Sequence, residues 1–221
     1  MTHPEMNRDA RLRGRDPGDP PPAVTVHLAT GGHVATGGFV ATGGFVATGG
    51  FVDTEELAAI AARTFPLACP PSVTAENIAS FIAANLSAER FTGYLNDPGR
   101  LIFTAQHEHR IIGYAMLVRG AAENAEVARA VGLRPAVELS KMYVLPDYHG
   151  QGVSTALMDA ALRGATRWSA RCVWLGVNQH NRRAQRFYAK HGFTVCGTRR
   201  FRLGSGVEDD YLMVRVFDPA G

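Results

Sequence analysis

The sequence predicts an α/β fold in which a mixed central sheet of about seven strands packs against about four helices. Its 221 residues, 46% of them hydrophobic, are enough for the core of one domain with a tail. Short apolar runs typical of strands are interspersed with segments whose apolar residues recur at helical spacing. In chain order these segments predict the pattern β-α-α-β-β-β-α-β-α-β-β, with a glycine-containing turn where the fourth strand leads into the third helix.

The first 52 residues divide into a tail, a strand and a repeat. Residues 1–22 are rich in Arg, Asp, Gly and Pro and lack apolar periodicity, so we expect them to be disordered. Residues 23–29 predict the first strand. Residues 30–52 contain three copies of Ala-Thr-Gly-Gly-Phe-Val after a related copy. We interpret them as a loop insertion, because each doubling of loop length costs only about 0.6 kcal/mol. A β-helix and a glycine-rich ligand loop are the alternatives.

Residues 53–218 supply the rest of the domain, which opens with two helices and a hairpin. Asp53 and Glu56 have the spacing of a capping box before a helix that extends to about residue 64. A second helix is predicted from about Thr74. The hairpin pairs residues 101–106 with 110–118, and its turn carries His107 and His109. On a tight turn we expect both histidines to face solvent rather than bind a metal.

The second half of the domain begins with a polar, alanine-rich connection at 119–136, followed by the strand 137–144. Strict alternation along that strand would put Glu138, Ser140, Met142 and Val144 on one face. A helix from about 153, a strand at 171–177 and a helix over about 181–191 follow. The pattern then predicts a closing hairpin of residues 193–203 and 211–217, joined by a turn at 204–210.

The turn between the fourth strand and the third helix predicts an anion site. Gly150 and Gly152 allow a close approach of the backbone to a ligand, and the apolar spacing starts a helix at about Val153. The first amides of a helix have no intrahelical partner and carry the positive end of its dipole. A phosphate or pyrophosphate fits that position. The two best-known phosphate-loop patterns, Gly-x-x-x-x-Gly-Lys-Ser/Thr and Gly-x-Gly-x-x-Gly, are not present at this turn.

Two motifs together resemble the Gcn5-related N-acetyltransferase (GNAT) family. The first is Val144-x4-His149-x2-Gly152-x-Ser154, and the second is Asn181-x2-Ala184-x2-Phe187-Tyr188 followed by Gly192-Phe193. The resemblance implies a GNAT fold whose strands splay at an acetyl-CoA site, with acetyl-CoA as co-substrate and no metal. The cofactor-binding residues that it implies are Met142, Tyr143, Val144, His149, Gly150, Gln151, Gly152, Val153, Ser154, Thr155, Asn178 and Asn181. His149 and Ser154 depart from the usual Gln/Arg and Gly/Ala, so we expect retained but weaker CoA binding.

The resemblance also implies the catalytic groups. Tyr188 would donate a proton to the leaving thiolate, and its alternative role is an aromatic residue on a core stripe. An alkylamine of pKa near 10.4 is mostly protonated at pH 7, so transfer needs a base. Glu138 is the candidate base, acting through a water. Its alternative role is an exposed strand residue or the partner of a nearby arginine.

Several passages are most similar to the bacterial polyamine acetyltransferases, among them Glu138–Val144 and Trp174–Val177. The acidic residues Glu208, Asp209 and Asp210 would suit a cationic acceptor, although a charge run in a turn is more often only solvated. The sequence therefore predicts acetyl transfer to a small amine or polyamine. The alternatives are acetylation of a protein or peptide, at its N-terminus or a lysine, and a non-catalytic module that senses acyl-CoA.

Composition limits the partners. The net charge of +3, from 23 basic and 20 acidic residues, is too even to indicate nucleic acid or a membrane surface. No apolar stretch approaches the roughly 20 residues that a membrane helix needs. Cys69, Cys172 and Cys196 lack metal-ligand spacing and are expected to be reduced. We expect a cytoplasmic protein, and exposed edge strands make a homodimer possible.

Overall fold

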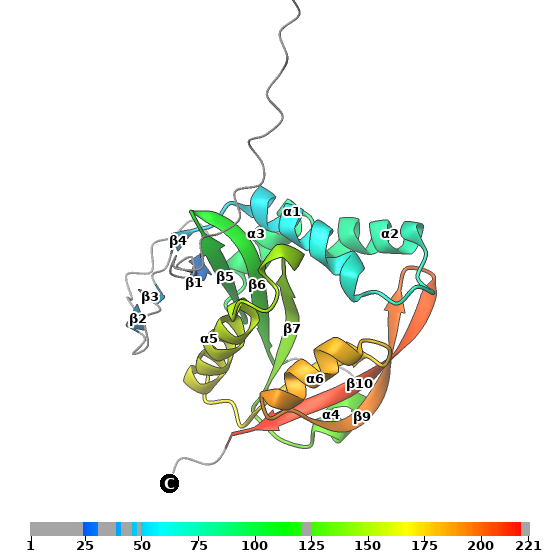
Figure 1. The fold of residues 1–221 in the computed structure, drawn as a ribbon. Helices are drawn as coiled ribbons and strands as arrows, with labels where there is room; N and C mark the ends of the chain where they lie inside the picture. Colours follow the sequence, from blue (N-terminus) through cyan, green and yellow to red (C-terminus); the bar gives the residue numbers. More distant parts are fainter. Residues whose placement is uncertain (1–23, 31–38, 41–45, 48–49, 121–124, 218–221) are drawn as a thin grey trace, which may run out of the picture.

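The computed structural model describes residues 24–30, 39–40, 46–47, 50–120 and 125–217 (Figure 1). Within these ranges one sheet of eight strands forms the centre of the molecule. Its spatial order is β4 (Gly50–Phe51), β1 (Thr25–Thr30), β5 (Arg100–His107), β6 (Arg110–Arg119), β7 (Ala136–Val144), β8 (Cys172–Asn178), β10 (Gly206–Val216) and β9 (Thr194–Leu203). Apart from the two-residue β4, these are the seven predicted strands, and the mixed α/β fold is confirmed.

The strands β7 and β8 separate in the middle of the sheet. They pair in parallel at three positions only, from Ala136 with Cys172 to Glu138 with Trp174. Beyond Glu138 the two strands no longer share hydrogen bonds, while β7 stays paired with β6 as far as Val144 and β8 stays paired with β10 as far as Asn178. This divergence confirms the predicted splay and opens the sheet between two strands whose outer partners remain in place.

Helices cover both faces of the sheet (Figure 1). α5 (Val153–Arg167) packs on β5, β6 and β7, where its Gly164 lies against Phe103. On the other face, Phe91 of α3 (Ala88–Asn96) meets the Tyr114 ring edge-on at 5.5 Å, and α1 (Thr54–Thr64) packs against α3 and β6. The remaining helices are α2 (Ala75–Asn85), α4 (Ala125–Val131), α6 (Arg182–Lys190) and the 3-10 turns η1 (Phe65–Ala68) and η2 (Pro146–Tyr148).

The described chain therefore has six α-helices rather than about four. The two that the sequence analysis missed are α3 and α4, both short. α3 fully buries a single residue, Phe91, and α4 buries only Val127 and Val131, next to β9 and β10. α3 begins three residues after α2 ends, so the pattern did not separate the two helices, and α4 has only seven residues, fewer than the roughly 11 over which apolar periodicity is recognised. None of the described helices is long and apolar enough to cross a membrane.

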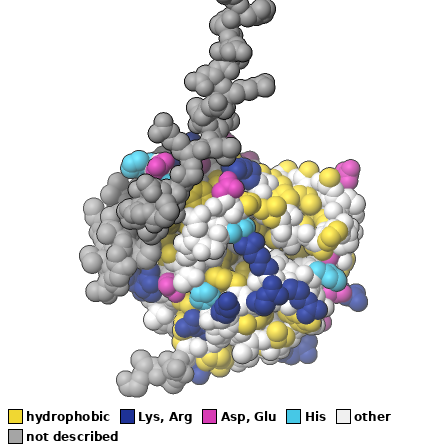
Figure 2. Space-filling view, in the orientation of Figure 1, with side chains coloured by type: hydrophobic (Ala, Val, Ile, Leu, Met, Phe, Trp, Pro, Cys, Tyr) yellow, Lys and Arg dark blue, Asp and Glu magenta, His cyan; other side chains and the backbone are white. Residues whose placement is uncertain are grey.

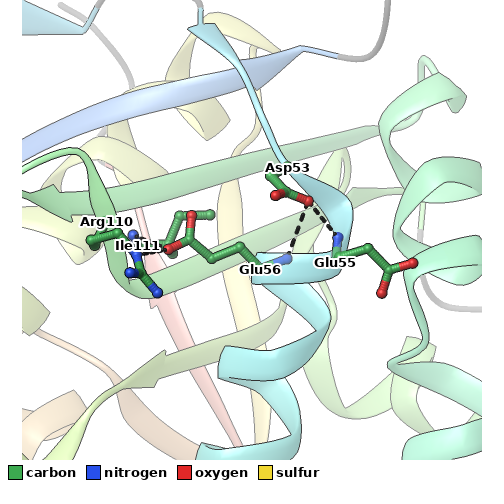
Figure 3. Close-up of polar contacts among 5 residues, drawn as sticks. All are labelled: Asp53, Glu55, Glu56, Arg110 and Ile111. Atoms are coloured by element: carbon green, nitrogen blue, oxygen red, sulfur yellow. Dashed lines mark hydrogen bonds and ion pairs between the residues drawn. The ribbon is translucent and has the colours of Figure 1, made fainter.

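The start of α1 shows how a predicted local motif was changed by a distant residue (Figure 3). The Asp53 carboxylate accepts hydrogen bonds from the amides of Glu55 and Glu56, so the N-cap forms as expected. The Glu56 carboxylate, however, accepts from Arg110 Nε at 2.7 Å and from the Ile111 amide at 3.2 Å instead of closing a capping box. The predicted box is thus half formed, and Glu56 ties α1 to the start of β6.

The closing hairpin has a shorter turn than predicted. β9 ends at Leu203 and β10 begins at Gly206, so residues 206–210 belong to a strand and not to a loop. Opposite charges across the pair explain this correction, since Asp209 faces Arg200 and Asp210 faces Arg199 in the ladder. Asn77 of α2 accepts hydrogen bonds from the amide and hydroxyl of Ser205, which fixes the hairpin tip.

The tail at 1–22 and most of the repeat segment at 30–52 lie outside the described residues, as do the predictions made for them. Besides its first and last residues, the described parts of the repeat segment are three two-residue strands: β2 (Phe39–Val40), β3 (Val46–Ala47) and β4. β2 and β3 pair with each other, and β4 pairs in parallel with the end of β1. The last copy of the repeat therefore adds an edge to the main sheet.

Candidate active site

The turn between β7 and α5 has the backbone of an anion cradle. Gly150 and Gly152 have φ angles of 79° and 82°, in the left-handed region that favours glycine. Gly152 is the N-cap of α5 and offers no side-chain hydrogen bond, so the first amides of the helix have no side-chain cap. His149 Nε2 donates to the Val144 carbonyl at 2.8 Å, which closes the turn on itself. The imidazole thereby supports the shape of the cradle.

A cavity of about 460 Å3, which we name the cradle cavity, opens in front of this turn. η1 and the end of α1 supply one wall, β7 and the glycine turn supply the floor, and α6 supplies the opposite wall. Its lining residues are Thr64, Leu67, Ala68, Met142, Tyr143, Val144, His149, Gly150, Gly152, Ser154, Thr155, Asn181, Arg183, Ala184, Phe187 and Tyr188. Figure 2 shows Lys and Arg side chains gathered in the region where α6 lies in Figure 1, and Arg183 brings a positive charge to the cavity wall.

Nine of the twelve predicted cofactor-binding residues line the cradle cavity, and three do not. The Gln151 side chain is exposed and donates to the Asp147 carbonyl at 2.7 Å. Val153 is buried in the core at 1% exposure. Asn178 lies farther along β8 and lines a different cavity. Sequence reasoning missed Arg183 and the η1 wall, although Arg183 lies only two residues after the recognised Asn181.

Asn181 acts as the N-cap of α6. Its Oδ1 accepts the Ala184 amide at 3.0 Å, and Gln185 donates to the carbonyls of Asn178 and Gln179. These bonds fix where the helix begins at the end of β8. Because residues spaced by 3.6 share a helix face, the cap also determines that Ala184, Phe187 and Tyr188 turn toward the opening between β7 and β8.

A second cavity of about 270 Å3, the carboxylate cavity, adjoins the cradle cavity at Tyr188. It shares Ala68, Met142, Tyr143, Asn181, Ala184 and Tyr188 with the cradle cavity. Its other walls include three carboxylates: Glu138, Glu208 and Asp210. Burial raises the pKa of the Tyr188 phenol to about 12, so this group stays protonated at neutral pH. Tyr188 is thus a neutral proton donor where the two cavities meet.

Glu138 lies at the point where β7 and β8 part. Burial raises the pKa of its carboxyl above the ordinary value, while Arg199, Lys141 and Arg100 oppose that shift. Arg199 Nη1 lies 3.8 Å from Glu138 Oε1, and Arg199 Nε lies 3.3 Å from Asp210 Oδ2. Glu138 therefore also has its alternative role as the partner of an arginine, through a long ion pair of 3.8 Å with Arg199. A carboxyl with a raised pKa also suits a general base near neutral pH.

The side chains of β7 do not alternate strictly between the two faces of the sheet, contrary to the prediction from the sequence. Its pairing with β6 shifts between Lys141 with Met116 and Leu139 with Leu117, so Ser140 is the extra residue of a bulge. Consequently Glu138 and Lys141, opposite Val118 and Met116, face the same side of the sheet, and every residue from Glu138 to Tyr143 lines the carboxylate cavity. Burial lowers the pKa of Lys141 to about 8, although Glu138 partly offsets this. Hydrophobic alternation gave no sign of the bulge or of this lysine.

The three carboxylates predicted to bind substrate do not all lie in the same cavity. Glu208 and Asp210 line the carboxylate cavity, and Asn178 Nδ2 donates to Glu208 at 3.3 Å. Burial raises the pKa of Asp210, with Arg199 opposing the shift. Asp209 is exposed and does not line the cavity, because successive residues of a strand face opposite sides of the sheet. Only two of the three line this cavity.

The histidines of the β5–β6 turn and the cysteines complete the comparison with the sequence. His109 is exposed, whereas His107 Nδ1 lies 3.0 Å from the Tyr148 hydroxyl and so is not simply solvated. The described residues contain no group of three or more His, Cys, Asp or Glu that could hold a metal ion. All three thiols are free, and burial raises the pKa of Cys69 to about 11, so this lining thiol stays protonated.

Comparison with known proteins identifies the class. The model of the GNAT acetyltransferase family matches residues 56–193, so the chain belongs to that family. It is 59% identical over 163 residues to an uncharacterised N-acetyltransferase of Mycobacterium tuberculosis, covering 74% of this chain and 97% of the relative. An uncharacterised N-acetyltransferase of Lactobacillus delbrueckii is 27% identical over 164 residues, covering 74% and 92%. The protein is accordingly an acyltransferase.

Solved structures share the fold at low identity. The PaiA N-acetyltransferase of Thermoplasma acidophilum, in complex with coenzyme A, superposes with a TM-score of 0.58 at 20% identity, covering 75% of this chain and 93% of that one. The ribosomal-protein-S18-alanine N-acetyltransferase of Escherichia coli gives 0.51 at 22% identity, covering 76% and 90%. At such identities the likeness shows the GNAT fold alone.

Proposed function

We propose that this protein transfers the acetyl group of acetyl-CoA to a small primary amine. The observation that carries the proposal is the meeting of two cavities at Tyr188, between strands that part in the middle of the sheet. One cavity offers backbone amides and a basic wall, and the other offers carboxylates. A thioester donor in one cavity and a cationic acceptor in the other would therefore meet at the same point.

The cradle cavity fits the pyrophosphate and pantetheine of CoA. The left-handed glycines and the α5 amides without a side-chain cap suit a phosphate, and Arg183 adds a positive charge nearby. β7 has no β8 neighbour beyond Glu138, so the main chain of Met142 and the Val144 amide are free to pair with the amides of pantetheine as with an added strand, whereas the Val144 carbonyl accepts from His149. When bound, acetyl-CoA supplies an acetyl group activated as a thioester.

The residues around the junction fit the proton transfers that amide formation requires. The acceptor nitrogen forms a C–N bond to the acetyl carbon as the C–S bond breaks, which leaves a thiolate and an acidic N–H. Glu138 accepts the proton lost by the acceptor nitrogen, through a water. Tyr188 provides a proton donor for the thiolate. Glu208 and Asp210 favour the approach of an ammonium group, which supports an amine acceptor and, in the sequence-based hypothesis, a polyamine.

The test is thiol release from acetyl-CoA across a panel of alkylamines, diamines, spermidine and peptides with free N-termini, with CoA binding followed by calorimetry. Turnover on small amines, together with CoA binding, would support the proposal. Turnover on peptides alone would favour protein acetylation, the runner-up. CoA binding without turnover on any acceptor would favour the sensor module and would overturn the enzymatic role of Tyr188.

A further inference from the structure

A third cavity of about 510 Å3, here named the arginine cavity, continues from the carboxylate cavity. Both cavities are lined by Glu138, Ser140, Arg199 and Phe201. Strands β5, β6 and β9 contribute Arg100, Arg119 and Arg200 to the far part of the arginine cavity, and the end of α3 contributes Asp97. The mechanism proposed above uses none of these four residues.

Basic residues predominate in the lining of the arginine cavity, whereas carboxylates predominate in the carboxylate cavity. Four arginines stand against two carboxylates, Asp97 and Glu138, an excess of two positive charges. Asp97 is committed to Arg100 at 2.8 Å and to the Gly99 amide at 2.8 Å. In the described part of the chain neither Arg119 nor Arg200 has a carboxylate within ion-pair distance. Asp209 faces Arg200 across the ladder but lies beyond ion-pair distance, and Arg119 lies over the Trp168 ring, so both guanidinium groups keep N–H donors for an anionic group.

A buried donor adds a second, independent observation. Trp174 lines the arginine cavity, is 3% exposed, and its indole Nε1–H has no hydrogen-bond partner among the described residues. The indole nitrogen can only donate, so the partner it lacks is an acceptor. Buried polar groups are rarely left unpaired in native proteins. Nε1 has almost no exposed surface, so an anionic ligand would contact the two arginines directly and the indole N–H only after a small shift of the cavity wall.

The spacing of residues along β7 would allow a single acceptor molecule to extend from the junction at Tyr188 to the arginine cavity. Ser140, which borders the arginine cavity, lies two residues before Met142, which borders the cradle cavity. At about 3.3 Å per strand residue the separation is roughly 7 Å. An acceptor whose amine reaches the junction at Tyr188 would therefore place a group several bonds away at Ser140, on the edge of the arginine cavity.

We infer that the acceptor is an amine whose far end carries an anionic group, a carboxylate or a phosphate, held by Arg119 and Arg200 beside the Trp174 wall. This inference rests on the proposed function and narrows it. The carboxylates Glu208 and Asp210 receive the ammonium end, and the arginine cavity receives the opposite charge. A polyamine would instead place its second ammonium among four arginines, so the geometry disfavours the polyamine acceptor that the sequence suggested.

The experiment compares acceptors of equal length that differ only at the far end: octylamine, 1,8-diaminooctane, 8-aminooctanoate and 8-aminooctyl phosphate. Each is tested with the parent protein, with the double variant Arg119→Gln/Arg200→Gln, and with Arg202→Gln. Arg202 is an exposed arginine of the same strand β9 that lines none of the three cavities, so its variant is the matched control.

In the parent we expect kcat/KM to be highest for an anionic acceptor and lowest for the diamine. The double variant should lose about tenfold on the anionic acceptors, gain on the diamine and stay within about twofold on octylamine, because each exposed charge contact contributes a modest factor. Whichever of the carboxylate and phosphate acceptors loses more identifies the anion. Equal losses on all acceptors, or a parent preference for the diamine, would overturn the inference.

A failure of the proposed function is separable from a failure of this inference. If no acceptor supports thiol release, the same four compounds are titrated calorimetrically into the CoA-saturated protein. Tighter binding of the anionic compounds, weakened in the double variant and unchanged in Arg202→Gln, would uphold the anion site without the enzymatic role. Binding that is equal for all four compounds would refute the anion site.

Discussion

Replacing Tyr188 by Phe tests the centre of the proposed mechanism. Positioned acids contribute about 100- to 10,000-fold to catalysis. The phenol pKa of about 12 lies roughly 3.5 units above the 8.5 of an ordinary thiol, so complete proton transfer to a thiolate is uphill. The hydroxyl therefore acts mainly as a hydrogen-bond donor to the developing charge. We expect the lower end of the range, about a 100-fold loss of kcat, or roughly 3 kcal/mol.

The substitution should leave folding and CoA binding nearly intact. The Tyr188 ring packs against Phe187 and Phe193, with centroids at 5.6 Å and 5.9 Å, and a Phe ring keeps both contacts. Its hydroxyl has no hydrogen-bond partner among the described residues, so none is left unpaired. Thiol release, calorimetry with CoA and urea unfolding measure the three effects, with Tyr211→Phe as a control outside the cavities. A kcat within about threefold of the parent would refute the acid role.

Two further predictions concern stability. The pKa of Lys141 falls from 10.5 to about 8 on folding, so between those pH values the unfolded chain binds more protons and the free energy of unfolding rises with pH. Lys141→Met should raise stability at pH 7 and abolish that rise, as urea unfolding at pH 7 to 10 would reveal; an unchanged pH dependence would contradict the burial of its ammonium. Tyr114 is fully buried, and its hydroxyl has no partner in the described structure. Because a buried unpaired polar group costs about 1–3 kcal/mol, Tyr114→Phe should raise the midpoint of urea unfolding, with a loss of stability as the opposing result.

The sequence determined the features whose signals are local. The strand ending at Val144, the glycines at 150 and 152 and the helix after them can be predicted because turn chemistry and helical periodicity are written in neighbouring residues. The segment from Asn181 to Tyr188 is likewise a cap and a helix face. Together these local patterns were sufficient for the family, the fold and most of the cradle cavity.

Only the tertiary structure decided what depends on residues far apart in the chain. The bulge at Ser140 exists because β7 must pair with β6, and it brings Lys141 onto the same wall as Glu138. Arg199 comes between Glu138 and Asp210 from a strand some 60 residues beyond Glu138. Such positions follow from strand register, and a sequence read in order carries no record of which strands become neighbours.

The residues proposed to bind the acceptor show most clearly the difference between what the sequence and what the tertiary structure determine. Glu208, Asp209 and Asp210 are adjacent in the sequence, yet strand alternation turns Asp209 away from the cavity that its two neighbours line. The arginines of the arginine cavity come from three strands and have no common motif. Contiguous motifs therefore predicted the residues proposed to bind acetyl-CoA. The charged residues proposed to bind the acceptor come together only where separate strands converge.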